Sequence, residues 1–278
     1  MKRKLLNSSK LIFKSYIFYI GIKYRFFTKK KTYSQFGEDL IINNFFGEFI
    51  GKYVDIGCYH PIKYSNTALL HKKGWTGVNI DLNETSINLF NACRKNDLNI
   101  VACLSDKRKK VSVYMDSEFS ALNSIYSDNS KIFKFKKYKK LTMKTKTFSD
   151  LVDKNFDFLN IDCEGNDYKI LKTINLKKYT PKLINVEVSK TDKKKIYRYL
   201  NSYGYRLLSK SSLSHIFKKV VKKKAIIWWP FRIWIFFGLH SHTYYANTDL
   251  FKNFTANFTA EMSQIESKQK GDFILEFS

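Results

Sequence analysis

The sequence predicts an α/β fold with a mostly parallel sheet and helices on both of its faces, and three observations support this. Short apolar runs with an acid at or near the end recur at residues 53–56, 78–81 and 156–162. Residues with a helical pattern follow the first two runs, at 65–73 and 86–94. The first two runs also have the spacing of a βαβ unit, in which a helix returns the chain to the next parallel strand.

Length and charge restrict the class of protein. A chain of 278 residues can form one main domain with extensions. The net charge of +26 is of the kind that nucleic-acid-binding and membrane-binding proteins carry. However, only seven of the 50 basic residues are arginines, and Asn, Ile, Phe and Tyr are abundant. These residue types have A+T-rich codons, so codon bias explains part of the basic excess.

Cysteine use and apolar runs bear on the compartment. The four cysteines are isolated, with no CxxC pair, which fits a reducing cytoplasm. No run reaches the ~18–20 apolar residues of a membrane-spanning helix. An apolar patch at 15–22 follows a basic start, but Lys14 and Lys23 bracket it and no small-residue cleavage site follows. We therefore expect a cytoplasmic protein without a cleaved signal peptide.

Residues 1–32 form a basic, amphipathic N-terminal extension. Ten basic residues and no acid occur in 1–31, interleaved with Leu, Ile, Phe and Tyr. This composition suits a helix in a membrane interface, at the inner face of the membrane, and equally a helix packed on the domain surface. Both interpretations remain open at this point.

The first half of the expected domain contains three strands of the sheet. A polar turn at 34–39 opens a helix with Glu38 and Asp39 in its first turn, where acids suit the helix dipole. Strand 53–56 leads to Gly57 and the crossover helix 65–73, and strand 77–80 leads to Asp81 and helix 86–94. A third strand, 99–104, ends at Ser105 and Asp106, and 111–115 is an added strand. Residues 116–146 are polar and too long for a tight connection, which predicts a lid or substrate loop.

The second half supplies two more parallel strands and an antiparallel pair. Strand 156–161 is followed by Asp162, Glu164, Gly165 and Asp167, and strand 183–188 contains Glu187. Helix 193–203 precedes an antiparallel pair at 205–209 and 214–218. Beyond it, residues 220–278 form a C-terminal extension: lysines fill five of the seven positions 218–224, and 225–239 hold three of the four tryptophans. Lysine beside tryptophan is typical of an interfacial anchor, although a buried hairpin or partner surface fits as well.

The acids at the strand ends predict a ligand site. In a doubly wound sheet the ligand lies outside the carboxyl ends of the strands, a glycine lets the backbone approach it, and an acid at the second strand binds ribose hydroxyls. Buried acids are unfavourable unless they are solvated or used. We therefore expect Asp55, Asp81, Asp162 and Glu187 to line a cleft that binds a nucleoside-bearing ligand.

Several motifs, in this order, resemble the FkbM family of S-adenosylmethionine-dependent methyltransferases. They are YSQFGEDL from Tyr33, YVDIGCYHP from Tyr53, SNT from Ser65, GWTGVNID from Gly74, the helix ending at Arg94, SALNS from Ser120, FLNIDCEG from Phe158 and INVEV from Ile184. The resemblance covers about 33–219, which we take as the methyltransferase domain. It implies a Rossmann-like class I methyltransferase fold with a seven-stranded, mostly parallel sheet, cytosolic action, and O-methylation of a sugar hydroxyl in glycan or polysaccharide biosynthesis.

The resemblance also implies roles for individual residues. Asp55 and Gly57 would bind S-adenosylmethionine, Asp81 would bind its ribose, Ser105 and Asp106 would lie near its adenine, and Gln35 with Glu38 would close over its methionine end. One departure is that Tyr59 and Pro61 stand where many methyltransferases have further glycines.

Methyl transfer needs an acceptor oxygen held in place and a group that removes its proton. Asp162 is the first candidate for this group, followed by Glu164, Glu187 and His60. The carboxylates could also hold a divalent cation, which we do not favour, and we assign no metal ligands.

Two other classes of protein fit parts of the sequence. A nucleic-acid-binding protein could use the lysine runs at 134–140 and 218–224, but the few arginines and the lack of a recognised module disfavour it. A non-catalytic scaffold could keep the fold, but Asp55, Gly57, Asp81 and Asp162 are intact. We expect a small-molecule or glycan acceptor, whose identity the sequence does not reveal.

Overall fold

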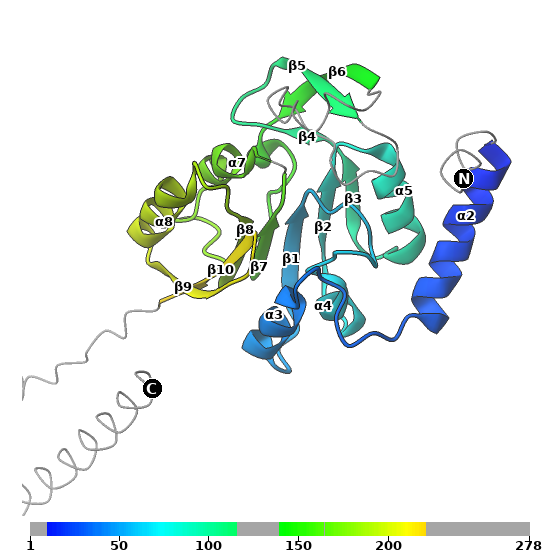
Figure 1. The fold of residues 1–278 in the computed structure, drawn as a ribbon, viewed down its shortest axis with the longest axis horizontal. Coiled ribbons are helices and arrows are strands. Elements are labelled where there is room, and N and C mark those ends of the chain that lie inside the picture. The colour runs from blue at the N-terminus through cyan, green and yellow to red at the C-terminus, as the bar shows by residue number, and fades with distance from the viewer. Residues whose placement is uncertain (1–9, 116–138, 164, 221–278) are drawn as a thin grey trace, which may run out of the picture. The chain divides into compact units, whose positions relative to one another are not determined.

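The computed structural model describes residues 10–115, 139–163 and 165–220 (Figure 1). The strands of the main sheet are β1 (Lys52–Ile56), β2 (Thr76–Asp81), β3 (Leu98–Val101), β7 (Phe158–Ile161), β8 (Leu183–Glu187), β9 (Tyr205–Lys210) and β10 (Ser214–Lys219). The helices are α2 (Lys10–Ile22), α3 (Glu38–Phe46), α4 (Ala68–Lys72), α5 (Glu84–Cys93), α7 (Asp167–Thr173) and α8 (Lys193–Ser202).

The main sheet has seven strands in the order β3-β2-β1-β7-β8-β10-β9. β1 runs parallel to β2 and β7, β2 to β3, and β7 to β8, whereas β10 runs antiparallel to both β8 and β9. The predicted seven-stranded, mostly parallel sheet with a terminal antiparallel pair is therefore confirmed. The chain returns to the centre of the sheet at β7, so the carboxyl ends of β1 and β7 lie side by side.

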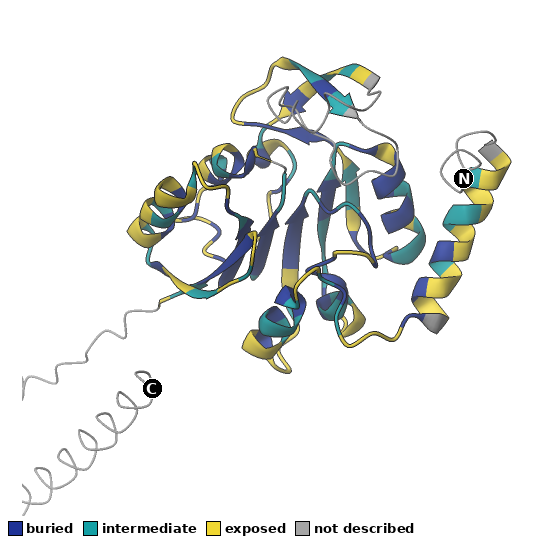
Figure 2. Cartoon of the chain, viewed as in Figure 1, coloured by how far each residue is buried: buried dark blue, intermediate teal, exposed yellow. Residues whose placement is uncertain are grey.

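Each face of the sheet has a different kind of cover. Because side chains alternate along a strand, Val54, Ile56, Leu159 and Ile161 share one face and form an apolar core with α7 and α8. Tyr53 and Phe158 point to the opposite face and pack with α3, α4 and Trp75. Helices thus cover both faces (Figure 2).

A row of polar side chains crosses the second face, two residues nearer the carboxyl ends of the strands than its apolar cluster. Asp55 on β1 is opposite Asn79 on β2 and Asn160 on β7, and Asn160 is opposite Asn185 on β8. All four side chains are buried. The Asn160 amide donates to Asp55 (2.8 Å) and the Asn185 amide donates to Asn160 (2.8 Å). These bonds connect three neighbouring strands through side chains as well as backbone.

Arg94, at the end of α5, is fully buried beneath the loop that joins β1 to α4. Its guanidinium donates to the Thr67 (2.8 Å) and Ser65 (3.0 Å) hydroxyls and to the Pro61 carbonyl (3.1 Å). Thr67 in turn donates to Asp55 (2.7 Å). A buried cation therefore holds the loop in place and is linked to Asp55 of the polar row through the Thr67 hydroxyl.

Two sequence predictions differ from the structure between β3 and β7. The predicted strand 99–104 is divided at Ala102 into β3 and β4 (Cys103–Leu104). The Ala102 N–H still donates to the Asp81 carbonyl at the end of β2 (2.8 Å), and beyond it Cys103 and Leu104 pair in a separate sheet. The expected loop 116–146 ends in a strand, β6 (Lys139–Lys146), and 116–138 lie outside the described residues. β6 pairs with β4 and with β5 (Lys110–Met115), the predicted added strand, in a separate three-stranded sheet.

The N-terminal helix α2 packs against the domain. Its buried residues Ile20 and, just beyond the helix, Tyr24 join Leu89 of α5 and Ala68 of α4 in one apolar cluster. One side of α2 therefore packs on the domain surface, as the second interpretation of this segment predicts. The predicted C-terminal extension, 220–278, lies outside the described residues except for Val220.

Removing the Arg94 guanidinium should destabilise the fold strongly. Arg94→Met keeps the aliphatic stem but leaves the loop hydroxyls and Asp55 without their buried cation, a change that typically costs about 3–5 kcal/mol. Arg198→Met, on the exposed surface of α8, is the matched control and should stay within about 0.5 kcal/mol of the parent. Urea unfolding of both variants is the measurement, and equal stabilities would contradict the role of Arg94.

Candidate active site

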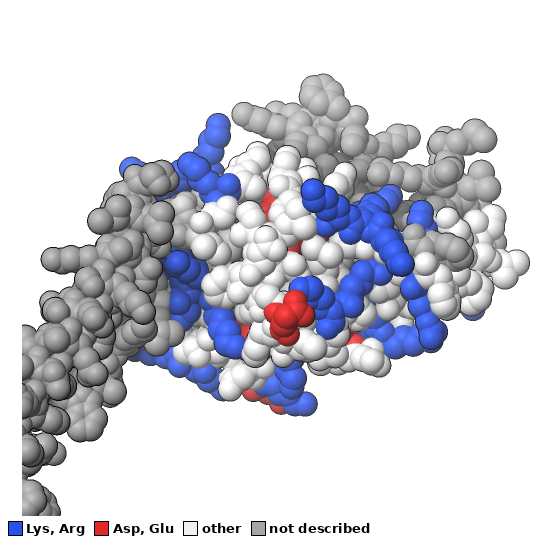
Figure 3. Space-filling model, turned by 90° about the horizontal axis from the view of Figure 1, so that it is seen from below, with Lys and Arg blue, Asp and Glu red and all other residues white. Residues whose placement is uncertain are grey.

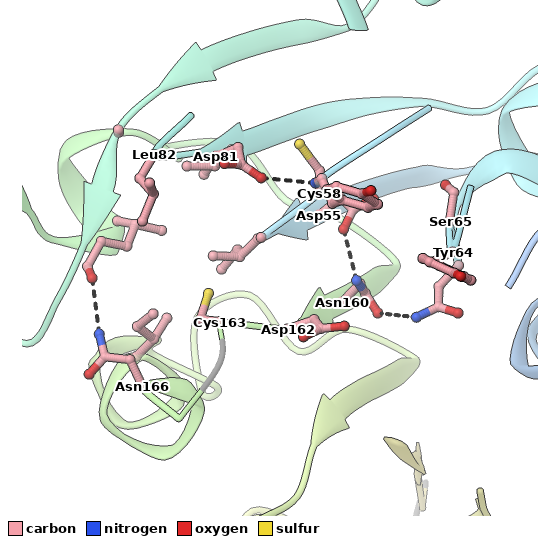
Figure 4. Close-up of a pocket in the computed structure, with 18 of the residues that line it drawn as sticks. Asp55, Cys58, Tyr64, Ser65, Asp81, Leu82, Asn160, Asp162, Cys163 and Asn166 are labelled. Atoms are coloured by element: carbon pink, nitrogen blue, oxygen red, sulfur yellow. Dashed lines mark hydrogen bonds between the residues drawn. The ribbon is translucent and has the colours of Figure 1, made fainter. Parts of the chain in front are cut away.

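A cavity opens at the carboxyl ends of β1, β2 and β7 (Figure 4). One part of its wall is polar and another is apolar. The polar part includes Gln35, Asp55, Tyr59, Tyr64, Ser65, Asn66, Asp81, Asn160, Asp162 and Asn166, with the backbone at Gly57, and the apolar part includes Leu82, Ala102, Leu104 and Ile170. Of the four strand-end acids expected to line one cleft, Asp55, Asp81 and Asp162 line this cavity and Glu187 does not.

Gly57 lies where the turn after β1 crosses the chain after β7. Its φ is +76°, in the region that favours glycine. A Cβ at this position would overlap the carbonyl oxygen of Asp162, and its N–H donates to the Ile80 carbonyl (2.8 Å). The glycine is therefore required by the close approach of two chain segments, in addition to the ligand approach expected from the sequence.

Asp81 ties the ends of β1 and β2 together. One carboxylate oxygen accepts the Tyr59 N–H (2.9 Å) and the other accepts the Asn83 N–H (2.8 Å). Burial raises the pKa of Asp81 to about 6, against the lowering effect of these two hydrogen bonds. Each carboxylate oxygen can accept a second hydrogen bond, so Asp81 can also accept from the hydroxyls of a ribose.

Asp55 lines the cavity, but protein groups already use both of its oxygens. Thr67 and Asn160 donate to them, and burial raises the pKa of Asp55. The Asn160 carbonyl oxygen also accepts from Asn66 (3.1 Å), which lies on the cavity wall. Asp55 therefore holds Asn160, and through it Asn66, in place on the cavity wall.

Two tyrosines of the β1–α4 loop have backbone conformations that are unfavourable for residues other than glycine. The φ angles are +51° at Tyr59 and +55° at Tyr64, and the two rings stack with centroids 6.3 Å apart. Both line the cavity. Such strain persists only where surrounding contacts hold it, and here the bond from Tyr59 to Asp81 is one of them. The resemblance marked Tyr59 only as a departure, and no sequence signal identified Tyr64.

A second, smaller cavity adjoins the first. It is lined by Gln35, Phe36, Glu38, Tyr64, Asn66, Asp162, Glu187, Leu213 and Ser214. Gln35, Tyr64, Asn66 and Asp162 belong to both linings. Asp162 is the one acid that the described linings of the two cavities share, so it stands at the junction between them.

Gln35 and Glu38 come to the second cavity from the start of α3. Glu38 is buried and accepts the Phe36 N–H (2.9 Å). The neighbouring Asp39 is also buried and accepts from the Tyr33 N–H and the Ser34 hydroxyl (2.6 and 2.8 Å). The acids of this turn therefore hold the segment that presents Gln35, a function beyond their effect on the helix dipole.

The other expected site residues lie elsewhere. His60 lines neither cavity: its Nδ1 accepts the N–H groups of Ile62 and Lys63 (3.0 and 3.2 Å), and burial, with nearby cations, lowers its pKa to about 3. It is a neutral residue that stabilises the turn at the start of the β1–α4 loop, which differs from the catalytic role expected of it. Glu164 lies outside the described residues.

Ser105 and Asp106 do not line the first cavity; Ala102, Cys103 and Leu104 do. The Ser105 N–H donates to the Lys146 carbonyl (3.0 Å) and its hydroxyl donates to Asp106 (3.0 Å). The path of β4 into the small sheet accounts for this position, because it takes the chain away from the cavity after Leu104.

Asp167, the first residue of α7, holds the loop after β7. Its carboxylate accepts the Cys163 N–H (2.7 Å) and the Gly165 N–H (3.0 Å). Burial, followed by the charge of Asp162, raises the pKa of Asp167. Asp167 therefore supports the segment that carries Asp162.

Two general features of the described residues bear on function. No group of three or more His, Cys, Asp or Glu side chains in this part of the chain is arranged to hold a metal ion. Within the same ranges, no helix has both the length and the apolar character needed to cross a bilayer.

The strand order and a cavity at the carboxyl ends of the first strands define a Rossmann-like methyltransferase fold. Comparison with family models agrees: the methyltransferase FkbM domain matches residues 55–207. This is more than half of the 278 residues, and the chain belongs to the FkbM methyltransferase family.

No curated protein matches the chain. Solved structures that are similar to it include two methyltransferases. An FkbM methyltransferase from Methylobacillus flagellatus KT shares 13% identity at a TM-score of 0.45, over 66% of this chain and 48% of that one. A putative RNA methyltransferase from Pyrococcus horikoshii shares 10% identity at a TM-score of 0.34, over 73% of this chain and 98% of that one. The chain spans about half the length of the Methylobacillus protein.

Membership in a methyltransferase family implies S-adenosylmethionine as the cofactor, and the cavity fits it. Asp81 can accept from ribose hydroxyls, and Leu82, Ala102 and Leu104 offer an apolar wall for a purine. Asp162 adds negative charge beside the polar end of the cavity, which suits a cationic sulfonium.

Adding one methyl group at Gly57 should force apart the two segments that meet there. Gly57→Ala places a Cβ on the Asp162 carbonyl. We expect the free energy of unfolding to fall by more than about 3 kcal/mol and cofactor binding to be lost. Gly204→Ala is the matched control, because φ is +75° there but the nearest atom to a Cβ is 3.9 Å away. It should cost only about 1–2 kcal/mol. Thermal unfolding and calorimetry with S-adenosylhomocysteine measure both effects, and similar losses in both variants would contradict the steric explanation.

The pKa of Asp81 predicts a pH-dependent affinity. Protonation below about pH 6 removes acceptor capacity that ribose hydroxyls need, so affinity for S-adenosylhomocysteine should be about tenfold weaker at pH 5 than at pH 7. Stability should change in the opposite sense, because a carboxyl whose pKa is raised on folding loses stabilisation as pH rises from about 4 to about 6. Asp81→Asn should bind weakly with no such pH dependence in calorimetry, and a parent affinity that is flat from pH 5 to pH 7 would exclude Asp81 as the ribose ligand.

Proposed function

We propose that the protein is an S-adenosylmethionine-dependent O-methyltransferase whose acceptor is a sugar hydroxyl in a glycan or polysaccharide precursor. The observation that carries this proposal is the position of Asp162 at the junction of the two cavities. Of the residues expected to bind the cofactor, Gln35, Asp55, Gly57 and Asp81 line the first cavity, whereas Glu38 lines only the second. The first cavity would therefore hold the cofactor, and the second would hold the acceptor.

The chain's residues have a simple task in this reaction. S-adenosylmethionine, when bound, supplies a methyl group on a sulfonium whose thioether is the leaving group. Asp81 and the backbone at Gly57 would hold the nucleoside part, and the second cavity would orient the acceptor hydroxyl. Asp162 would accept the hydroxyl proton as the oxygen attacks, which contributes on the order of 10²–10⁴ in rate for a positioned general base.

The second cavity has the chemical character of a sugar site. Glu38, Asp162 and Glu187 offer carboxylate acceptors, and Asn66 and Ser214 offer an amide and a hydroxyl. The rings of Phe36 (53% exposed) and Tyr64 lie at the same cavity and can pack on the C–H faces of a pyranose. Carboxylates for hydroxyls and aromatic faces for C–H groups together favour a polyhydroxylated acceptor over an apolar one.

The acceptor class can be tested with material from cells that lack the protein. Glycan, lipid, protein and nucleic-acid fractions of a deletion strain are incubated with the purified protein and methyl-labelled S-adenosylmethionine. We expect label in the glycan fraction, stable to esterase treatment as an ether is. Label confined to protein or nucleic acid would refute a sugar acceptor, and absence of cofactor binding would favour the non-catalytic scaffold.

Asp162→Asn should separate binding from turnover. It keeps the shape but removes the charge, so we expect affinity for S-adenosylhomocysteine within about threefold of the parent and methyl transfer to the labelled fraction at least about a hundredfold slower. Asp153→Asn, at an exposed position that lines neither cavity, controls for the substitution itself. Near-parental turnover in Asp162→Asn would transfer the role to Glu187 or Glu164, and a loss of cofactor binding would place Asp162 in the cofactor site.

A further inference from the structure

Helix α2 is apolar on two opposite sides, but it packs on the domain through only one of them. Tyr16, Ile17 and Ile20 share one side, at helical spacing, and contribute to the apolar cluster with α4 and α5. Phe18 and Ile22 lie four residues apart on the opposite side, and neither belongs to a buried cluster. Phe18 is 69% exposed and Ile22 is 38% exposed. A helix that is hydrophobic all round is normally buried, so the outer side of α2 is suited to a second surface.

Basic residues surround this outer side. Lys14 is exposed on α2, and Lys23 and Arg25 are exposed on the short π-helix η1 (Lys23–Phe27) that continues it. Lys29, Lys30 and Lys31 are exposed immediately beyond. No acidic residue occurs before Glu38. Lysine and arginine side chains also outnumber acidic ones on the face seen in Figure 3. The surface that contacts the outer side of α2 should therefore be both negatively charged and able to accept an aromatic side chain.

We propose that the outer face of α2, centred on Phe18 and Ile22, docks the protein onto an anionic lipid bilayer. An interfacial helix buries its apolar face at the boundary of headgroups and acyl chains while its basic residues attract anionic headgroups. The charge distribution favours a bilayer over an apolar groove in a protein partner, because the same segment exposes six cations between residues 14 and 31 and the first acidic residue of the chain is Glu38. The inference is independent of the methyltransferase activity, since α2 lines neither cavity.

Vesicle flotation of the full-length protein tests this. Vesicles of phosphatidylcholine with about 30% phosphatidylglycerol should carry the protein upward, neutral phosphatidylcholine vesicles should not, and roughly 0.5 M salt should release it. Phe18→Glu/Ile22→Glu should weaken binding at least about tenfold. Leu98→Glu/Leu207→Glu adds the same charge at exposed residues of β3 and β9, and it should bind as the parent does. Lys14→Gln/Lys23→Gln/Arg25→Gln should bind more weakly and with less dependence on salt.

Three results would overturn the proposal. The first is a parent protein that does not bind the anionic vesicles. The second is unchanged binding by Phe18→Glu/Ile22→Glu, which would assign membrane contact to another segment. The third is that the parent sediments as a dimer, Phe18→Glu/Ile22→Glu sediments as a monomer, and neither binds vesicles. This result would identify the face as an interface between copies of the chain. Thermal unfolding and binding of S-adenosylhomocysteine verify that each variant is folded.

Discussion

The hydrogen bond from Asn160 to Asp55 is the interaction on which the centre of this structure depends. It joins β1 to β7 at the point where the order of strands reverses, and the Asp55 carboxylate that accepts it is buried. A buried carboxylate is tolerated only when its oxygens are satisfied. Here Asn160 satisfies one oxygen and Thr67 the other, and Thr67 is in turn held by Arg94. One buried charge therefore connects two strands, the β1–α4 loop and the end of α5.

The geometry of the site follows from the same row of residues. Asn79, Asp55, Asn160 and Asn185 occupy equivalent positions on four parallel strands. Two residues further along each strand come Asp81, Gly57, Asp162 and Glu187. Because side chains alternate with a period of two, the buried polar row lies on the same face of the sheet as these strand-end positions and next to them. Bonds within the row thus limit the movement of the chain that carries the acids.

Gly57 connects stability to function in a second way. The turn after β1 passes so close to the Asp162 carbonyl that no side chain fits between them. The same contact fixes the position of the Asp162 loop relative to the turn at Gly57, and both segments line the first cavity. Asp167 completes this arrangement from the other side of the loop by accepting two of its backbone N–H groups. The positions of Gly57 and Asp162 are therefore coupled, although 105 residues separate them in the sequence.

The sequence by itself determined the class of fold, the strand ends and the convergence of Asp55, Asp81 and Asp162, because these depend on local periodicity and on the rule that parallel strands end at one edge. It did not reveal the division of the third strand, the strand at the end of the expected loop, or the buried network of Arg94, which depend on partners distant in the chain. Nor could it show which residues of the β1–α4 loop line the cavities: Tyr64 and Asn66 do, whereas His60 accepts backbone N–H groups. That distinction is decided only by the tertiary path of the β1–α4 loop, since neighbouring residues in an irregular loop follow no repeat that fixes the direction of their side chains.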